Sequence, residues 1–272
     1  MKNNAYLVLF FLMFLSTFSN ASQQQEDQIP VHETFTIVSK QLGENRIINV
    51  WLPLEYHSNS EPLPVLYMAD GGIKEDFPHI ANTLAELIKK KSIPPMILIG
   101  IENTYRRRDL TGFTAVEEDK KIAPVVGSSA KFRTFIKEEL FPEINKKYTT
   151  TTRKGLIGES LAGLFVVETL LTQPDLFDIY IAFDPSLWWN KHHLVKTAKE
   201  NLMKLPSDKK QFWFAGSNAR DIYVYTKQLA QILKTFAPTT LKWTYSAEPK
   251  EQHQTIFRAT KEKALVWAFE NK

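Results

Sequence analysis

The sequence predicts an α/β protein built on one mostly parallel sheet of eight strands, with helices on both faces. Two β-rich segments open the chain around a short turn, and further apolar runs follow that mostly alternate with segments of helical periodicity. Runs that are apolar throughout are typical of strands buried on both sides, and their alternation with helices is typical of a parallel sheet. No repeat or low-complexity linker divides the 272 residues, so we expect one domain.

Each element follows from a local pattern. Thr34–Lys40 and Arg46–Leu52 flank a turn containing Gly43, which predicts an opening hairpin. Short apolar runs predict strands at Val65–Ala69, Met96–Ile101, Gly155–Gly158, Ile179–Phe183, Phe212–Ala215 and Leu241–Tyr245. Helical spacing or intervening position predicts helices at Ile80–Lys91, Ser129–Tyr148, Leu161–Thr172, Lys191–Leu205, Ile222–Phe236 and Ile256–Phe269. We expect Pro142 to kink the second of these helices.

Composition excludes several classes of function. The formal charge is +4, from 34 basic and 30 acidic residues, and no dense basic block accompanies it, which argues against a nucleic-acid partner. The chain has no cysteine, so disulfides, thiolate metal sites and a cysteine nucleophile are excluded. No metal-ligand cluster, phosphate-binding loop or dinucleotide glycine pattern is present in the sequence, and we therefore expect no metal and no cofactor.

The first 21 residues have the pattern of a secretory signal peptide. Lys2 precedes an apolar run from Ala5 to Leu15, and small residues lead to a cleavage site after Ala21. The alternative is an uncleaved anchor or a buried helix, but the apolar run is shorter than the roughly 20 residues that a membrane span needs. We expect residues 22–272 to form a single periplasmic or secreted domain without stable membrane insertion.

A candidate nucleophile follows the third parallel strand. Ser160 lies in the segment Gly158–Gly163, between a buried run and a helix. A nucleophilic serine at a sharp strand-to-helix turn requires very small residues two positions before and after it, and Gly158 and Ala162 meet that requirement. The alternative role is a serine that caps the helix.

The general base of such a site is expected near the end of the chain, after the acid. Of six histidines, only His192, His193 and His253 follow Ser160. His253 lies in the loop after the last strand, where the base belongs, whereas His192 and His193 begin a helix and are expected at the surface or the pocket rim.

Two carboxylates compete for the role of the triad acid. Asp221 lies in the loop after Phe212–Ala215, and Asp184 directly follows Ile179–Phe183. Either would orient the imidazole and stabilise its charged form. We favour Asp221 and keep Asp184 as the competitor.

The oxyanion hole is expected to combine two backbone N–H groups. Leu161 begins the helix behind the nucleophile, where the helix dipole favours negative charge. Gly72 lies in the glycine-containing loop after the first parallel strand, which allows close approach of the backbone to a substrate.

Together these features resemble the "putative esterase" family of α/β-hydrolases, which includes esterase D type enzymes, enterochelin-type siderophore esterases, feruloyl esterases and mycolyltransferases. The resemblance covers nearly all of residues 22–272 and rests on the segments 65–67 with 70–72, 100–103 with 107–111, 158–165, 174–177, 185–189 and the loop of His253. It implies an α/β-hydrolase fold, ester cleavage, and the roles of nucleophile and base for Ser160 and His253.

Three positions depart from the family pattern. Relatives often have His where Glu159 stands and Gly where Ala162 stands, and they commonly have Ser where Asp184 stands. A carboxylate at Glu159, beside the nucleophile, is expected to raise the pKa of His253 or to repel anionic substrates.

The long segment 102–127 lacks clear periodicity and follows a strand end, which favours a role at the pocket. Arg106, Arg107 and Arg108 lie in it, and we single out Arg107 as a candidate substrate ligand; the alternative is a solvated run of charges. Trp188 and Trp189 are candidates for stacking on the substrate, or for packing in the core and at its rim.

The leading hypothesis is an exported serine hydrolase that cleaves a siderophore-like or small acyl ester through an acyl-enzyme on Ser160, with His253 as general base. One alternative passes the acyl group to an alcohol instead of water. Another is a catalytically silent protein that binds a siderophore-like ligand. The expected partner is a small-molecule ester, and the sequence indicates no oligomeric state.

Overall fold

The computed structural model describes residues 27–58, 61–122 and 124–270. The predicted signal peptide therefore lies outside the described residues. Eight strands form one sheet in the order β1-β2-β4-β3-β5-β6-β7-β8. Their bounds are Glu33–Ser39 (β1), Glu44–Trp51 (β2), Leu63–Ala69 (β3), Ile97–Ile101 (β4), Thr150–Glu159 (β5), Ile179–Phe183 (β6), Lys210–Gly216 (β7) and Leu241–Ala247 (β8).

The predicted hairpin and parallel sheet are confirmed. β1 pairs antiparallel with β2 and β2 antiparallel with β4, while the pairs from β4 through β3, β5, β6 and β7 to β8 are all parallel. The chain order of β3 and β4 is reversed in the sheet, so β3 lies next to β5. All carboxyl ends of the parallel strands consequently meet along one edge, where the loops that carry chemistry are expected.

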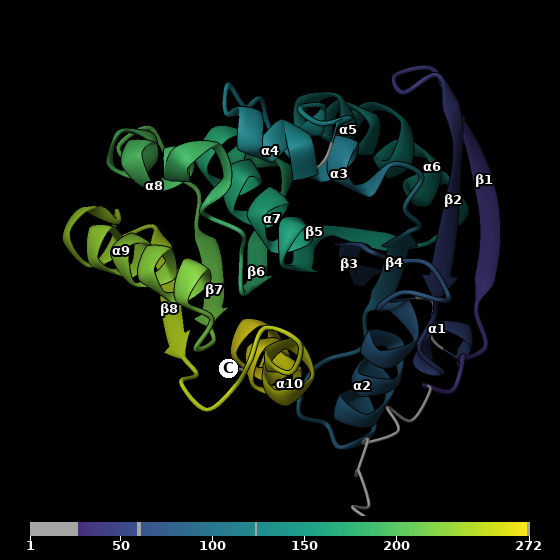
Figure 1. Cartoon of the computed structure of the whole chain (residues 1–272). Helices are drawn as coiled ribbons and strands as arrows, with labels where there is room; N and C mark the ends of the chain where they lie inside the picture. Colours follow the sequence, from purple (N-terminus) through teal and green to yellow (C-terminus); the bar gives the residue numbers. More distant parts are fainter. Residues whose placement is uncertain (1–26, 59–60, 123, 271–272) are drawn as a thin grey trace, which may run out of the picture.

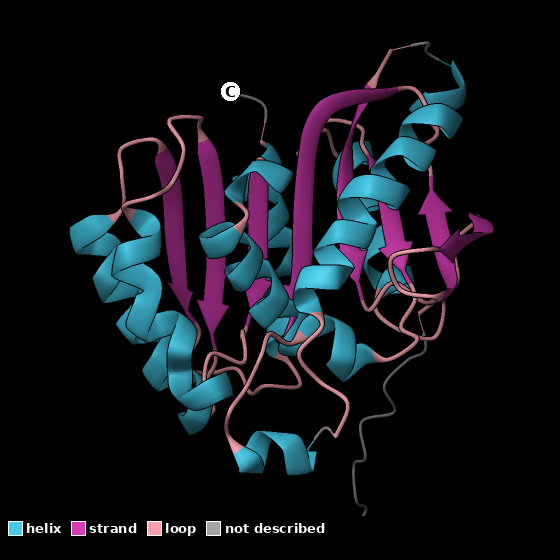
Figure 2. Ribbon diagram, turned by 90° about the horizontal axis from the view of Figure 1, so that it is seen from above, coloured by secondary structure: helices cyan, strands magenta, loops and turns pink. Residues whose placement is uncertain are grey.

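Helices cover both faces of the sheet (Figures 1 and 2). α2 (Phe77–Lys89) and α10 (Ile256–Phe269) lie together on one face, and contribute to one buried cluster of apolar side chains. The second cluster, on the opposite face, holds residues of the elements α5 (Ser129–Phe135), α6 (Phe141–Lys147), α7 (Leu161–Thr172), α8 (Trp189–Leu202) and α9 (Arg220–Phe236). Short helices α1 (Glu55–Ser58), α3 (Arg106–Leu110) and α4 (Glu117–Ile122) and a 3₁₀ turn at Pro174–Leu176 complete the order. No described helix is long and apolar enough to cross a membrane.

The long helix predicted at residues 129–148 is divided into three consecutive pieces. A π-helical segment, Ile136–Leu140, joins α5 to α6, and Phe141 N–H bonds to the carbonyl of Ile136 five residues back. Pro142 follows at the start of α6. Because proline has no N–H and its ring collides with a carbonyl four residues back, the wider π turn accommodates it without ending the helix.

The segment expected to lack regular structure, residues 102–127, contains the two short helices α3 and α4. Asp119 of α4 accepts hydrogen bonds from Thr114 Oγ1 at 2.6 Å and from the backbone N–H of Asn190 at 2.9 Å. The segment is therefore attached to the start of α8. Asn190 and the next two residues have left-handed backbone angles, which bend the chain sharply at that attachment.

Candidate active site

Ser160 lies on a strained turn between β5 and α7. Its φ and ψ are 57° and −116°, a conformation that L-residues rarely adopt. A Cβ on Gly158 would approach the Cβ of Ala162 to 2.6 Å, and one on Gly163 would approach the carbonyl oxygen of Phe183 to 2.9 Å. The requirement for small residues therefore extends to Gly163, beyond the two predicted positions. Ser160 is the N-cap residue directly before α7 but its side chain makes no cap hydrogen bond, which removes the alternative role of a capping serine.

Ser160, His253 and Asp184 form a continuous hydrogen-bonded series. His253 Nε2 lies 3.1 Å from Ser160 Oγ, and His253 Nδ1 lies 2.9 Å from Asp184 Oδ2. His253 lies in the loop between β8 and α10, as predicted from its position in the sequence. With a proton on Nδ1, the imidazole donates to Asp184 and presents a free acceptor at Nε2 to the serine hydroxyl.

Asp184 is held rigidly at the end of β6. Its side chain is fully buried, and it accepts hydrogen bonds from Ser217 N–H and Ser217 Oγ–H, both at 2.6 Å. Its φ of 41° turns the chain immediately after the strand. The short loop after β7 thus supplies a support for the acid, Ser217, that sequence reasoning missed.

Asp221 does not contact His253, contrary to the pairing favoured from the sequence. It is exposed in the first turn of α9 and acts on the imidazole only through its charge. The physical reason is the order of strands. β6 lies directly beside β5, so the residue after β6 reaches the site of Ser160, whereas β7 is one strand further away.

The charges around the site raise the pKa of His253 above its ordinary value. The hydrogen bond to Asp184 is the largest cause; burial partly opposes it, and the negative charge of Glu159 adds to it. Burial in turn raises the pKa of Glu159 to about 8. In the described part of the chain, no group of three or more His, Asp or Glu side chains is arranged to hold a metal ion.

The two predicted oxyanion donors differ in their availability. Leu161 is the first residue of α7, so its N–H has no acceptor within the helix. Gly72 N–H, however, donates to Glu75 Oε2 at 2.7 Å, and the same carboxylate accepts from Asn103 Nδ2 at 2.8 Å. Glu75 therefore occupies the Gly72 donor in this structure, in the turn that precedes α2.

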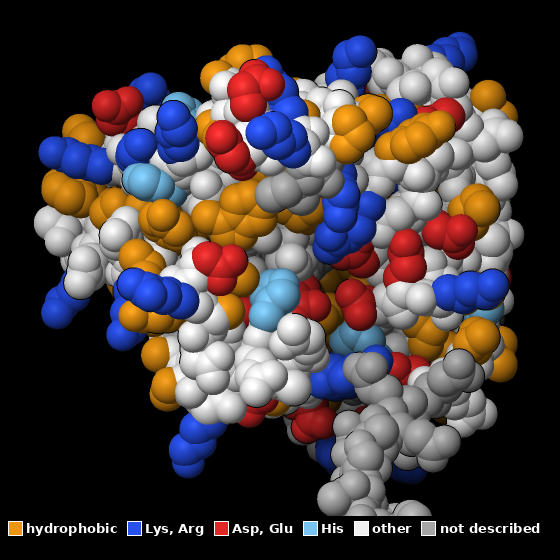
Figure 3. Space-filling view, in the orientation of Figure 1, with side chains coloured by type: hydrophobic (Ala, Val, Ile, Leu, Met, Phe, Trp, Pro, Cys, Tyr) orange, Lys and Arg blue, Asp and Glu red, His pale blue; other side chains and the backbone are white. Residues whose placement is uncertain are grey.

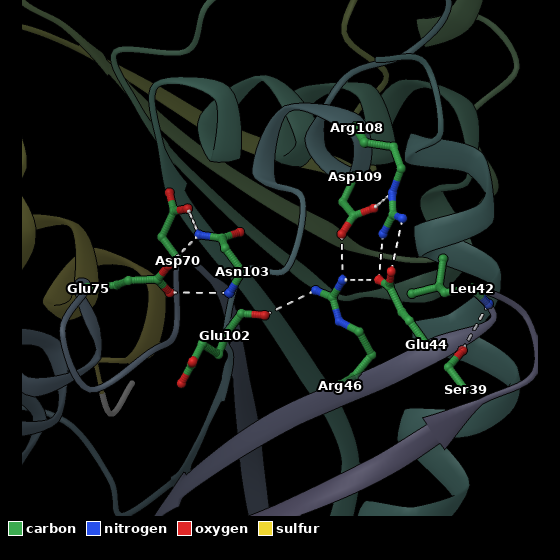
Figure 4. A network of polar contacts seen from close by, with 10 residues as sticks. All are labelled: Ser39, Leu42, Glu44, Arg46, Asp70, Glu75, Glu102, Asn103, Arg108 and Asp109. Carbon is green, nitrogen blue, oxygen red and sulfur yellow. Dashed lines mark hydrogen bonds and ion pairs between the residues drawn. The ribbon is translucent and has the colours of Figure 1, made fainter. Parts of the chain in front are cut away.

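Arg106, rather than the predicted Arg107, lies beside this loop. Arg106 donates from Nε to Asp70 Oδ1 at 2.6 Å and from Nη2 to Asp70 Oδ2 at 2.7 Å. Asn103 Nδ2 also donates to Asp70 Oδ1, and Figure 4 shows Asp70, Glu75 and Asn103 converging there. Arg107, the next residue on α3, is exposed.

The two tryptophans have different environments. Trp189 is buried and donates from Nε1 to the carbonyl of Gly112 at 3.0 Å, so it is a core residue. Trp188 is partly buried and follows Ser186 by two residues, whose Oγ lies 3.4 Å from Ser160 Oγ. Trp188 is therefore the one of the pair that remains a candidate for contact with substrate.

The two other histidines considered from the sequence lie outside the hydrogen-bonded series. His192 stacks on Tyr225, with ring centroids 4.8 Å apart. His193 lines a small cavity of about 30 Å³ next to Trp189.

The fold and the site define an α/β-hydrolase with a serine, a histidine and a carboxylate in hydrogen-bonding series at the carboxyl ends of the strands. The chain belongs to the family described as "Putative esterase", whose model matches residues 39–260.

Individual relatives carry more specific names. The chain is 33% identical to the ferri-bacillibactin esterase BesA of Bacillus subtilis over 49% of its own length and 51% of that protein. It is 30% identical to a siderophore triacetylfusarinine C esterase of Aspergillus fumigatus over 63% of its length and 61% of that protein. An IroE-like serine hydrolase from Shewanella oneidensis has a similar structure, with a TM-score of 0.79 and 29% identity over 88% of this chain and 80% of that one. The chain therefore spans about half the length of the first of these curated relatives.

Proposed function

We propose that this protein is an exported serine hydrolase that cleaves carboxylic esters through an acyl-enzyme on Ser160. The observation that carries the proposal is the series from Ser160 Oγ to His253 Nε2 and from His253 Nδ1 to Asp184, at 3.1 and 2.9 Å. These distances suit proton transfer and orientation of the base. Export is supported by the signal-peptide pattern of residues 1–21 alone.

The reaction would proceed in two halves. Ser160 Oγ attacks the ester carbonyl while His253 Nε2 takes the hydroxyl proton, and Asp184 stabilises the imidazolium. Collapse of the tetrahedral intermediate breaks the bond to the alcohol, which leaves with the proton from His253. Water then gives a proton to His253 and attacks the acyl group, and collapse of the second tetrahedral intermediate returns that proton from His253 to Ser160 Oγ and releases the acid.

The Leu161 N–H is the oxyanion donor that the structure supports best. It lies at the N-terminus of α7, directly after the nucleophile, where backbone N–H groups and the helix dipole stabilise negative charge. The Gly72 N–H contributes only when the Glu75 carboxylate leaves it. We infer a small-molecule ester of siderophore type as substrate, because one curated relative is named as a siderophore triacetylfusarinine C esterase and another as a ferri-bacillibactin esterase.

Hydrolysis of p-nitrophenyl acetate and butyrate tests the mechanism. The purified protein should release p-nitrophenol, and a serine-directed fluorophosphonate should form one adduct at Ser160 and block the release. Ser160→Ala and His253→Ala proteins serve as references for background hydrolysis. Folded wild-type protein that is no faster than these references, and that does not react with the phosphonate, would contradict the serine-hydrolase proposal.

The pH dependence should reflect the raised pKa of His253. His253 accepts the serine proton only when neutral, so kcat/KM should fall as the pH decreases through an apparent pKa above the ordinary 6.5. The measurement is kcat/KM for p-nitrophenyl acetate between about pH 5 and pH 9. An acid limb centred below 6.5 would show that the hydrogen bond to Asp184 does not dominate the environment of the imidazole.

A further inference from the structure

Glu159 is the last residue of β5 and immediately precedes the nucleophile. In the sheet it is opposite Phe183, one residue before the triad acid. The side chain is half-buried, and it forms no hydrogen bond or ion pair with any residue in 27–58, 61–122 or 124–270. A carboxyl group that is partly removed from water without a partner is unfavourable, and therefore calls for an explanation.

The charged groups around Glu159 come from every element that surrounds the site. They are Asp70 after β3, Asp76 before α2, Arg106 on α3, Asp184 after β6, His253 before α10 and Arg258 on α10. Figure 3 shows the hollow in the centre of this face, between α3 and α10, with acidic and histidine side chains at its floor and sides.

Each of these neighbours already has an opposite charge or a histidine as its partner. Asp70 pairs with Arg106, and Asp184 with His253. Asp76 contacts His79 Nε2 at 3.0 Å.

The remaining charged neighbour of Glu159, Arg258 on α10, also has a partner. Arg258 donates from Nη1 to Asp27 Oδ1 at 3.1 Å. Neither of the two arginines near Glu159 is therefore left to neutralise it, and the carboxyl group directly precedes the nucleophile in the chain.

We propose that Glu159 is a specificity-determining residue that selects esters carrying a positive charge, such as a substituted ammonium group, on the acyl part near the scissile bond. The inference rests on the proposed esterase function and narrows its substrate class. A cation bound there would supply the missing partner of the carboxylate, whereas an anionic group would be repelled by it. The same charge lies beside His253, so it also favours the imidazolium formed during the reaction.

A pair of isosteric substrates tests the selection. p-Nitrophenyl 4-(trimethylammonio)butanoate carries a permanent positive charge, and p-nitrophenyl 5,5-dimethylhexanoate has the same shape without it. At pH 8.5, kcat/KM for the cationic ester should exceed that for the neutral ester by about tenfold, a size between the solvent-exposed and near-surface limits for charges in contact. Glu159→Gln should bring the ratio close to one, and its rate on the neutral ester measures any separate effect of the lost charge on His253.

Two further measurements separate a role in specificity from a merely structural one. Because Glu159 is ionised only above its raised pKa of about 8, the preference for the cationic ester should grow between pH 6.5 and pH 9 in the wild type and stay flat in Glu159→Gln. Glu200→Gln removes one carboxylate from an exposed position of α8, and should leave the ratio unchanged. All rates are corrected with the Ser160→Ala protein.

The outcomes distinguish the two proposals. Hydrolysis of both esters with the same ratio in wild type and Glu159→Gln would overturn the selection by Glu159 and leave the esterase proposal intact. Hydrolysis of neither ester, nor of the acetate and butyrate, would overturn both proposals.

Discussion

Asp184→Asn is expected to lower kcat/KM for p-nitrophenyl esters by about 10⁴-fold, as the loss of a triad acid does in other serine hydrolases. Asp184 only accepts hydrogen bonds, from Ser217 and from His253 Nδ1. An asparagine can keep the contact to Ser217 N–H with its oxygen, and its NH₂ group then faces Nδ1 of the imidazole. It therefore favours the tautomer with the proton on Nε2, which cannot accept the proton of Ser160.

Asp221→Asn is the matched control, because it removes the carboxylate that the sequence favoured. Asp221 is exposed, and affects His253 through its charge alone, so we expect a change in kcat/KM of no more than about threefold, the scale of a screened surface charge. Both variants should melt close to the wild type. If Asp221→Asn lost activity and Asp184→Asn kept it, the assignment of the acid from the geometry would be wrong.

The pH profile gives a second readout for the same pair. The hydrogen bond that His253 donates to Asp184 is the largest contribution that raises the pKa of His253. Its removal should shift the acid limb of the remaining activity to lower pH, whereas Asp221→Asn should leave the limb nearly in place. A loss of activity caused only by poor folding would lower the amplitude of the profile without moving the limb.

The positions of Ser160 and His253 beside each other were predictable because their signals are local. Ser160 requires small neighbours at fixed spacing, and the contacts that a side chain would make at Gly158 and Gly163 explain why. His253 follows the last strand, and the edge of the sheet brings that loop to the serine. Both residues could therefore be located from the order of strands and helices along the chain.

The acid was not predictable in the same way, because Asp184 and Asp221 both follow strands. The choice between the two aspartates depends on which strand lies next to β5, and no local sequence pattern predicts the order of strands in the sheet. Similarly, Arg106 and Arg107 are adjacent on a helix of five residues, and only the phase of that helix decides which one reaches Asp70. Glu75 reaches Gly72 N–H because of the packing between the loops and α2, and the periodicity of the sequence does not predict this contact.

A second substitution with a large expected effect acts on the free energy of unfolding. It removes one member of a buried charge network beside the site. Arg46 of β2 is fully buried, and its Nη1 lies 2.5 Å from Asp109 Oδ2 on α3, which is also fully buried. Arg46 also contacts Glu44 at 3.0 Å and the carbonyl of Glu102 at 3.1 Å (Figure 4). The guanidinium carbon lies 5.1 Å from the ring centroid of Phe132, so an apolar side chain packs against the network.

Arg46→Met should therefore lower the free energy of unfolding by about 3–5 kcal/mol, the usual cost of removing one partner from a buried ion pair. Methionine fills most of the space but leaves the Asp109 carboxylate with one cation, Arg108, and leaves the Glu102 carbonyl without its donor. Urea-induced unfolding followed by circular dichroism measures the change. The slope of the transition should stay the same if the native state keeps its compactness.

A double variant determines whether Arg46→Met is destabilised by the unpaired Asp109 carboxylate or by lost packing. Asp109→Leu combined with Arg46→Met replaces the central pair by apolar side chains, and should recover part of the stability lost in the single variant. Equal stability of the single and double variants would contradict the electrostatic explanation. Because the network joins β2 to α3, which also carries Arg106, a loosened network should reduce esterase activity as well, and the double variant should restore part of both.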